Sequence, residues 1–197
     1  LRLKITLEHV DPAPWREIEI RSDKTLPHLH DAIQAAFLWN DMHLWDFRVG
    51  DRKYERKDGE FWMEPMFGPP VMEVTTKKLD FFLNAKVLPV TYTYDFGDDW
   101  VHRVELVSKR SVEPNEPLPR FVGGQWATPP EDIGGPPMYE VFKEARNDAN
   151  HPEHEWAKEA GYVDWDHDEI HSDVIVEQFS KLQIQKTRRT SRWVMGG

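Results

Sequence analysis

The start of the chain alternates between apolar and polar side chains. Apolar residues occupy positions 1, 3, 5 and 7, and charged or hydroxyl residues lie between them. This period of two is expected of a strand with one buried face. After a break rich in proline at residues 11–14, a second apolar alternation runs over residues 15–20. We therefore predict two strands that pair as a hairpin.

The next segment has a helical period. Leu26, Leu29, Ile33 and Phe37 recur at spacings of three or four, which places them on one helical face. Thr25 is a suitable N-cap, and proline is tolerated in a first turn. A third strand is expected over residues 44–49. The order strand, strand, helix, strand is typical of a β-grasp unit, in which the helix packs across a mixed sheet.

Beyond this unit, residues 90–96 and 100–106 alternate again, with Gly97, Asp98 and Asp99 between them as a turn. Helical patterns follow at residues 138–147, 152–160 and 172–185. The sequence predicts an α+β fold over residues 1–197 as a single domain. Its mixed sheet would have a β-grasp-like N-terminal half, an added β-hairpin and C-terminal helices.

Composition narrows the kind of site that is possible. Apolar residues make up 39% of the chain and aromatic residues 12%, which is enough for a real core. There is no cysteine, so thiolate sites and disulfides are excluded, and any metal would need His, Asp, Glu or carbonyl ligands. No apolar run approaches the ~20 residues of a membrane span. We expect no membrane association and a cytoplasmic location.

The net charge argues against general nucleic-acid binding. The 25 basic and 35 acidic residues sum to −10, whereas such binding depends on neutralising phosphates. The exception is a basic tail from about residue 186, which contains Lys186, Arg188, Arg189 and Arg192. These residues either contact phosphate or are simply solvated.

Three motifs resemble those of one known family. The first is spread over Leu26, Leu29, His30, Ile33, Gln34, Trp39, His43, Leu44, Phe47 and Tyr54; the second is YDFGDDWVH at residues 94–102; the third is PPEDIGG at residues 129–135, followed by Tyr139. Together they resemble the plasmid pRiA ORF-three-like family. The resemblance implies one α+β domain in a family without an established biochemical activity. This chain has Thr128 and Met138 where the family often has cysteine and glycine.

The central hairpin offers the first candidate residues. Strict alternation places His102 in an apolar row with Trp100, and Asp95 on the opposite face. Asp98 lies in the turn, where aspartate accepts bonds from nearby backbone N–H groups. The pattern favours a structural turn with an inward histidine held by a hydrogen bond. A bulge at Gly97 would reverse the facing of one strand.

Histidines and carboxylates supply the remaining candidates. His30, His43 and His102 each adjoin a core face, and they would share a metal only if the fold brought them within ~4 Å of one point. Separate hydrogen-bonded histidines are the alternative. Glu131 and Asp132 follow paired prolines and precede paired glycines, so their loop has a specified shape. They would hold Mg²⁺ or Ca²⁺, act as general base and orienter, cap the helix near Tyr139, or pair with an arginine.

Two functional hypotheses remain. The first is a cytoplasmic, non-catalytic binding or interaction module, indicated by abundant aromatics and motifs framed by proline and glycine. The second is a metal-dependent hydrolase or nuclease that uses Asp95, His102, Glu131 and Asp132. It requires a divalent metal, with His102, Glu131 and Asp132 as candidate ligands. Neither hypothesis identifies a ligand or partner.

Overall fold

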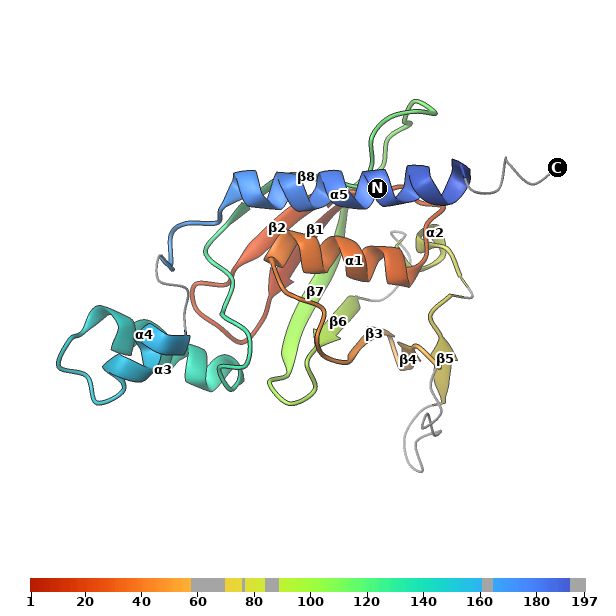
Figure 1. The fold of residues 1–197 in the computed structure, drawn as a ribbon. Coiled ribbons are helices and arrows are strands. Elements are labelled where there is room, and N and C mark those ends of the chain that lie inside the picture. The colour runs from red at the N-terminus through yellow and green to blue at the C-terminus, as the bar shows by residue number, and fades with distance from the viewer. Residues whose placement is uncertain (58–69, 76, 84–88, 161–164, 192–197) are drawn as a thin grey trace.

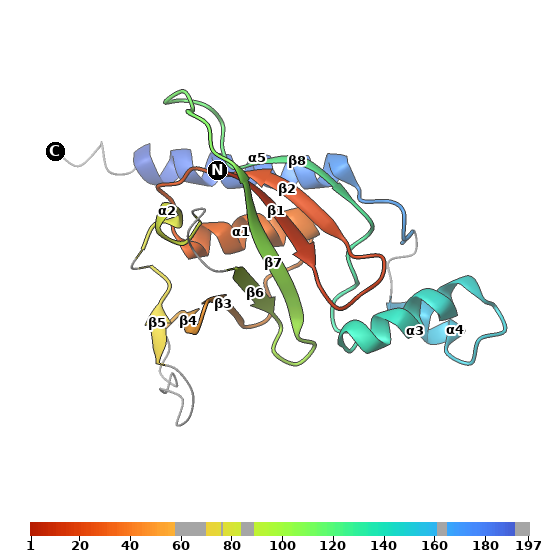
Figure 2. The ribbon, with the colours of Figure 1, turned by 180° about the vertical axis from the view of Figure 1, so that it is seen from behind.

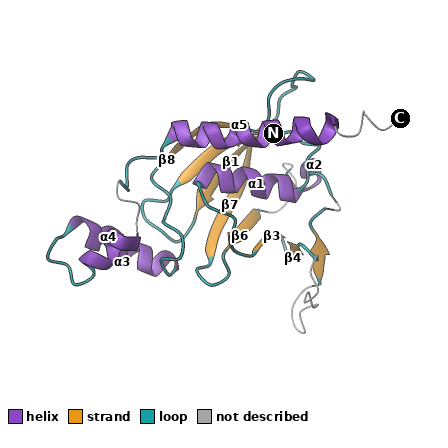
Figure 3. Cartoon of the chain, in the orientation of Figure 1, coloured by secondary structure: helices purple, strands orange, loops and turns teal. Residues whose placement is uncertain are grey.

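The structure is a computed structural model that describes residues 1–57, 70–75, 77–83, 89–160 and 165–191, with the side chains of residues 185–191 left out. Its elements are β1 (Arg2–Leu7), β2 (Trp15–Glu19), α1 (Leu26–Phe37), β3 (Trp45–Val49), β4 (Arg52–Glu55), β5 (Val71–Glu73), α2 (Leu79–Phe82), β6 (Val90–Tyr94), β7 (Trp100–Ser108), β8 (Arg120–Gln125), α3 (Gly135–Asn147), α4 (His154–Ala160) and α5 (Ser172–Ser191) (Figure 1). Figure 3 separates helices from strands in the same view. Of the basic tail, Arg192 and the side chains of Lys186, Arg188 and Arg189 lie outside the described residues.

The described strands form one sheet of eight in the order β5-β4-β3-β6-β7-β1-β2-β8. Every neighbouring pair is antiparallel except β4 and β5, which run parallel. The expected α+β fold with a mixed sheet is therefore confirmed. The order strand, strand, helix, strand is present, but the β6–β7 hairpin lies between β1 and β3. The β-grasp-like arrangement is not confirmed, because the N-terminal strands do not form a sheet of their own.

Two helices cover one face of this sheet. Figure 1 shows α1 and α5 in front of the strands, and the view from behind in Figure 2 shows the strands in front of both helices. The apolar stripe of α1 is fully buried at Leu26, Leu29, Ile33 and Phe37, as its spacing predicts. Leu3 and Ile5 of β1 are buried against the same core. Burial of each such side chain stabilises the fold by roughly 1.5–3 kcal/mol.

The C-terminal part contains two departures from the predicted elements. The strand β8 has no counterpart among the predicted elements, because it contains the glycine pair Gly123-Gly124 and glycine weakens a strand pattern. Gly124 is needed there because a Cβ atom would lie 2.7 Å from both Arg16 Cδ and the carbonyl oxygen of Trp15. The helix α3 begins at Gly135, earlier than residue 138, since prolines fit a first helical turn.

The helices α3 and α4 lie together at one end of the molecule, away from α1 and α5 (Figure 1). Among the described residues, no helix combines the length and the apolar character needed to cross a bilayer.

Candidate functional site

Three loops that carry the three sequence motifs meet at one place. The loop after α1 carries His43, the β6–β7 turn carries Asp95, and the loop before α3 carries Asp132. The Gly134 N–H donates to Asp98 Oδ2 at 3.1 Å, which joins the second loop to the third. The Asn40 N–H donates to Glu131 Oε1 at 2.8 Å, which joins the first to the third.

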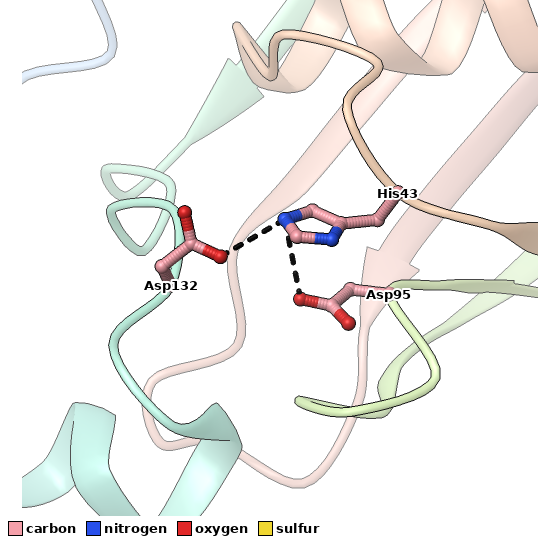
Figure 4. Close-up of side chains that lie close together, drawn as sticks. All are labelled: His43, Asp95 and Asp132. Atoms are coloured by element: carbon pink, nitrogen blue, oxygen red, sulfur yellow. Dashed lines mark ion pairs between the residues drawn. The ribbon is translucent and has the colours of Figure 1, made fainter.

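The point where these loops meet is a cluster of one imidazole and three carboxylates. His43 Nε2 lies 2.9 Å from Asp132 Oδ1, 3.6 Å from Asp95 Oδ2 and 3.9 Å from Glu131 Oε2. One ligand atom from each of His43, Asp95 and Asp132 lies within 4.8 Å of the others. Figure 4 shows the two aspartates approaching the same ring nitrogen from different ribbons. We call these three residues the His43 triad.

The imidazole of His43 is not satisfied by its neighbours. Its Nε2 atom is buried and has no hydrogen-bond partner, although Asp132 Oδ1 is only 2.9 Å away. The aspartate oxygen therefore lies off the direction in which the ring nitrogen donates or accepts. Unpaired buried polar atoms are uncommon, so this one requires an explanation.

The backbone turns both aspartates of the triad toward His43. Asp95 has φ 55° and Asp132 has φ 57°, in the left-handed region that few residues other than glycine adopt. Aspartate tolerates this conformation because its side chain bonds locally, and Asp95 Oδ1 accepts the Gly97 N–H at 2.9 Å. The left-handed turn ends the strand alternation at Asp95, so the facing expected from strict alternation does not describe its carboxylate.

Glu131 is the most constrained carboxylate of the site. Tyr94 Oη donates to its Oε1 at 3.3 Å, in addition to the bond from Asn40. Burial raises the pKa of Glu131, and the bonds from Asn40 and Tyr94 oppose that rise. The Asp132 side chain is 60% exposed, whereas that of Asp95 is 10% exposed. The site therefore opens to solvent on the side of Asp132.

His102 does not belong to the triad. It is fully buried, its Nδ1 lies 3.3 Å from the Tyr92 carbonyl oxygen, and its ring packs edge-on against Phe37 and Trp39. Burial lowers the pKa of His102 to about 3, so this imidazole is neutral. The position expected for His102 beside Glu131 and Asp132 is taken by His43, which lies in the loop after α1, whereas His102 lies in β7.

His30 belongs to a separate closed ring of hydrogen bonds. Because Asp41 Oδ1 only accepts, His30 Nε2 donates to it at 2.9 Å, and His30 Nδ1 accepts from Tyr92 Oη at 2.8 Å. Gln34 Nε2 donates to Tyr92 Oη at 3.0 Å, and the Asp41 N–H donates to Gln34 Oε1 at 2.9 Å. Burial lowers the pKa of His30 to about 4. The three candidate histidines therefore do not share one point.

The other candidate residues, Trp100, Tyr139 and Asp98, make structural contacts near the site. Trp100 and Tyr139 are buried, and their rings meet edge to face with centroids 6.4 Å apart. Tyr139 Oη donates to the Ala127 carbonyl at 3.4 Å. Asp98 is used by its bond to Gly134. These contacts hold the loops in place.

Sequence reasoning missed one structural residue, Arg16. Its side chain is buried without a carboxylate partner, and it donates to the carbonyls of Ala36, Trp15 and Gln125 at 2.9 Å each. A weaker bond of 3.3 Å reaches Thr128 Oγ1. Burial lowers the pKa of Arg16 to about 10. The arginine ties the end of α1 to the segment that precedes Glu131. The sequence did contain an indication of this role. Arg16 lies two residues before Ile18, so it shares the buried face of β2 although it is charged.

Comparison with known protein families matches residues 1–174 to the family described as Plasmid pRiA4b ORF-3-like protein. The chain belongs to this family. The family expected from the three sequence motifs is thereby confirmed. Those motifs are the segments that meet around the His43 triad.

Two relatives extend the comparison. The uncharacterized protein y4hQ of Sinorhizobium fredii (strain NBRC 101917 / NGR234) is 31% identical over 166 residues, which is 82% of either chain. The crystal structure of MM3350 from Methanosarcina mazei Go1, a protein of unknown function, has a TM-score of 0.77 and 28% identity. The match covers 87% of this chain and 94% of that one. These likenesses show family and fold, and neither relative's description assigns an activity.

Proposed function

We propose that this protein is a binding module built around a divalent-cation site, with His43, Asp95 and Asp132 as ligands. The observation that carries the proposal is the buried His43 Nε2, which has carboxylate oxygens at 2.9 and 3.6 Å but no hydrogen bond. A cation between these atoms would satisfy the nitrogen and both oxygens together.

The distances suit one ion. Metal–nitrogen and metal–oxygen bonds of ~2.0–2.5 Å allow two ligand atoms on opposite sides of an ion to be separated by ~4–5 Å. The three ligand atoms lie within 4.8 Å of one another. One imidazole with carboxylates suits Zn²⁺ or Mn²⁺ better than Mg²⁺ or Ca²⁺, which prefer oxygen alone.

Electrostatics supports the same proposal. Three carboxylates approach one imidazole. Burial is the main cause of the raised pKa of Glu131, and repulsion by Asp132 adds to it. A dication relieves this repulsion and is attracted by it. The exposed side of Asp132 leaves a path for the ion and for a partner that completes its coordination. We also propose the cytoplasmic location expected from the sequence, which cell fractionation with an antibody would test.

Calorimetric titration of chelator-treated protein tests the cation site. We expect one Zn²⁺ or Mn²⁺ to bind per chain, and His43→Ala or Asp95→Asn to weaken binding by at least about tenfold, roughly 1.4 kcal/mol. Asp51→Asn, which removes an exposed charge outside the site, should leave affinity unchanged. The proposal is wrong if the wild-type protein binds neither metal, or if His43→Ala binds as well as wild type.

A metal-dependent hydrolase is the second candidate, and one observation favours it. Glu131 Oε2 lies 3.9 Å from His43 Nε2, and burial raises the pKa of this carboxyl group. A carboxylate beside a bound ion is placed to take a proton from water. The residues expected for the hydrolase change in one position, because His43 takes the place of His102, which is buried in the core.

Hydrolysis of bis(p-nitrophenyl) phosphate with added Mn²⁺ or Zn²⁺ separates the two functions. Activity lost in Glu131→Gln, while that variant still binds the metal, would establish the hydrolase. If the metal-loaded wild type shows no turnover of phosphodiesters or peptides, the non-catalytic module remains.

A further inference from the structure

Tyr94 lies where the three loops of the site come together. It is the last residue of β6 and directly precedes Asp95, and its side chain is fully buried. That side chain bonds to the loop that carries His43 and to the loop that carries Glu131. One residue therefore adjoins or contacts all three loops, and it is placed to fix the groups around it.

The ring of Tyr94 is held between two other rings. It stacks on Trp39, with centroids 4.9 Å apart and an angle of 27° between the planes. The imidazole of His43 meets it edge to face, with centroids 5.7 Å apart and an angle of 70°. Both arrangements are ones that aromatic pairs prefer. The phenol is therefore fixed in place, and its hydroxyl group lies at a defined position beside the His43 triad.

The hydrogen-bond partners of the Tyr94 hydroxyl group decide where its single proton points. Oη accepts the Met42 N–H at 3.0 Å, which occupies one of its lone pairs. The proton is donated to the carboxylate of Glu131, whose Oε1 and Oε2 atoms lie 3.3 and 3.4 Å away. A hydrogen bond to an ionised carboxylate is stronger than one between neutral groups.

Glu131 is thereby held with one oxygen toward His43. Oε1 accepts the Asn40 N–H at 2.8 Å. Oε2 is bonded by Tyr94 alone among the described residues, and it lies 3.9 Å from His43 Nε2. The Glu131 side chain is only 11% exposed, so these bonds rather than water orient it. An ion bound by the His43 triad would have this oxygen beside it.

We propose that Tyr94 is a positioning residue of the cation site, and that its hydroxyl group holds the Glu131 carboxylate toward the bound ion. This inference rests on the proposed function, because it concerns the same ion. Tyr94 acts through Glu131 and does not touch the ion itself. Replacing a residue that orients the groups around a metal commonly changes metal affinity by roughly 10–100-fold.

Tyr94→Phe tests the proposal because it keeps the ring and removes only the hydroxyl group. Calorimetric titration of the chelator-treated full chain with Zn²⁺ or Mn²⁺ should show an affinity about tenfold below that of the wild type. Tyr92→Phe is the matched control, since it removes another buried hydroxyl group of β6, whose partners are His30 and Gln34. Its metal affinity should equal that of the wild type. An equal loss in both variants would overturn the proposal.

A double-mutant cycle with Glu131→Gln distinguishes positioning from general support of the loops. Glutamine keeps an oxygen for Tyr94 but has no charge to offer the ion, so Tyr94→Phe should change affinity by less than about twofold in this background. A full tenfold loss there, or wild-type affinity in Tyr94→Phe alone, would overturn the role of Tyr94 and leave the cation site in place. If the wild-type protein binds neither metal, the proposed function is wrong, and this inference falls with it.

Discussion

Gly135 lies directly against the backbone of Asp98. A Cβ atom at position 135 would come within 2.3 Å of the Asp98 carbonyl oxygen, and Gly135 has φ 76°. Together with the bond from Gly134 to the Asp98 carboxylate, this contact joins the turn that carries Asp95 to the loop that carries Asp132. The spacing of the His43 triad therefore depends on a residue without a side chain.

Gly135→Ala should separate these two loops. The clash involves backbone rather than a flexible side chain, and the left-handed φ adds strain, so we expect a loss of roughly 2–4 kcal/mol in unfolding free energy. Affinity for Zn²⁺ should fall as well. Urea unfolding and calorimetry measure the two effects. Gly123→Ala, which has open space around its added Cβ, is the control. Wild-type metal affinity in Gly135→Ala would contradict this coupling.

Gly124→Ala should destabilise the edge of the sheet. Its Cβ would lie 2.7 Å from the Trp15 carbonyl oxygen and from Arg16 Cδ, so β2 and β8 would have to move apart. Overpacking of this kind costs roughly 1–3 kcal/mol. The neighbouring Gly123→Ala should change stability by no more than ~0.5 kcal/mol. Equal midpoints of urea unfolding for the two variants would show that β2 and β8 leave room for a methyl group at position 124.

Arg16→Met should be far more damaging than removal of an exposed arginine. The change removes the donors that Arg16 gives to the carbonyls of Ala36 and Gln125, and each buried group left unpaired costs about 1–3 kcal/mol. Arg103 is the control because its ion pair with Glu8 is 41% exposed on the arginine side. Arg103→Met should cost no more than ~1 kcal/mol. Thermal unfolding of both variants under one condition gives the comparison, and similar losses would argue against a structural role for Arg16.

Acid should destabilise the fold before most carboxylates titrate. The pKa of His30 is lowered to about 4 and that of His102 to about 3, in both cases mainly by burial. An unfolded chain binds these protons near pH 6.5 while the folded chain does not, so stability is full above pH 6.5 and falls as pH decreases toward 4. Each histidine accounts for on the order of 3 kcal/mol of this loss.

Urea unfolding at intervals between pH 7.5 and 4.5 measures this slope. His102→Gln should flatten it, whatever its effect on stability at pH 7, because one titrating group is removed. A slope that is equally steep in His102→Gln would show that other groups take up the protons.

Local periodicity was sufficient for much of the fold. The alternation over residues 1–7 corresponds to β1, and the helical spacing from Leu26 to Phe37 corresponds to α1. These patterns succeed because the spacing of apolar positions follows the backbone period of the element itself, and that period depends only on residues close in the chain. The strand β8 was missed because glycine is uncommon inside strands. The reason for Gly124 lies in β2, where Arg16 and the Trp15 carbonyl oxygen leave no room for a Cβ atom.

The site depended on contacts that no local pattern encodes. The candidate residues could be recognised in the sequence as polar groups in loops of specified shape. The predicted metal ligands, however, combined His102 with Glu131 and Asp132. In the fold, His102 points into the core, while left-handed backbone at Asp95 and Asp132 directs both carboxylates to His43. Side-chain direction in a loop follows from its individual φ angles and from the loops packed against it. The sequence by itself therefore determines the residue types and the period of the buried positions. Only packing brings His43 next to two aspartates that are distant in the chain.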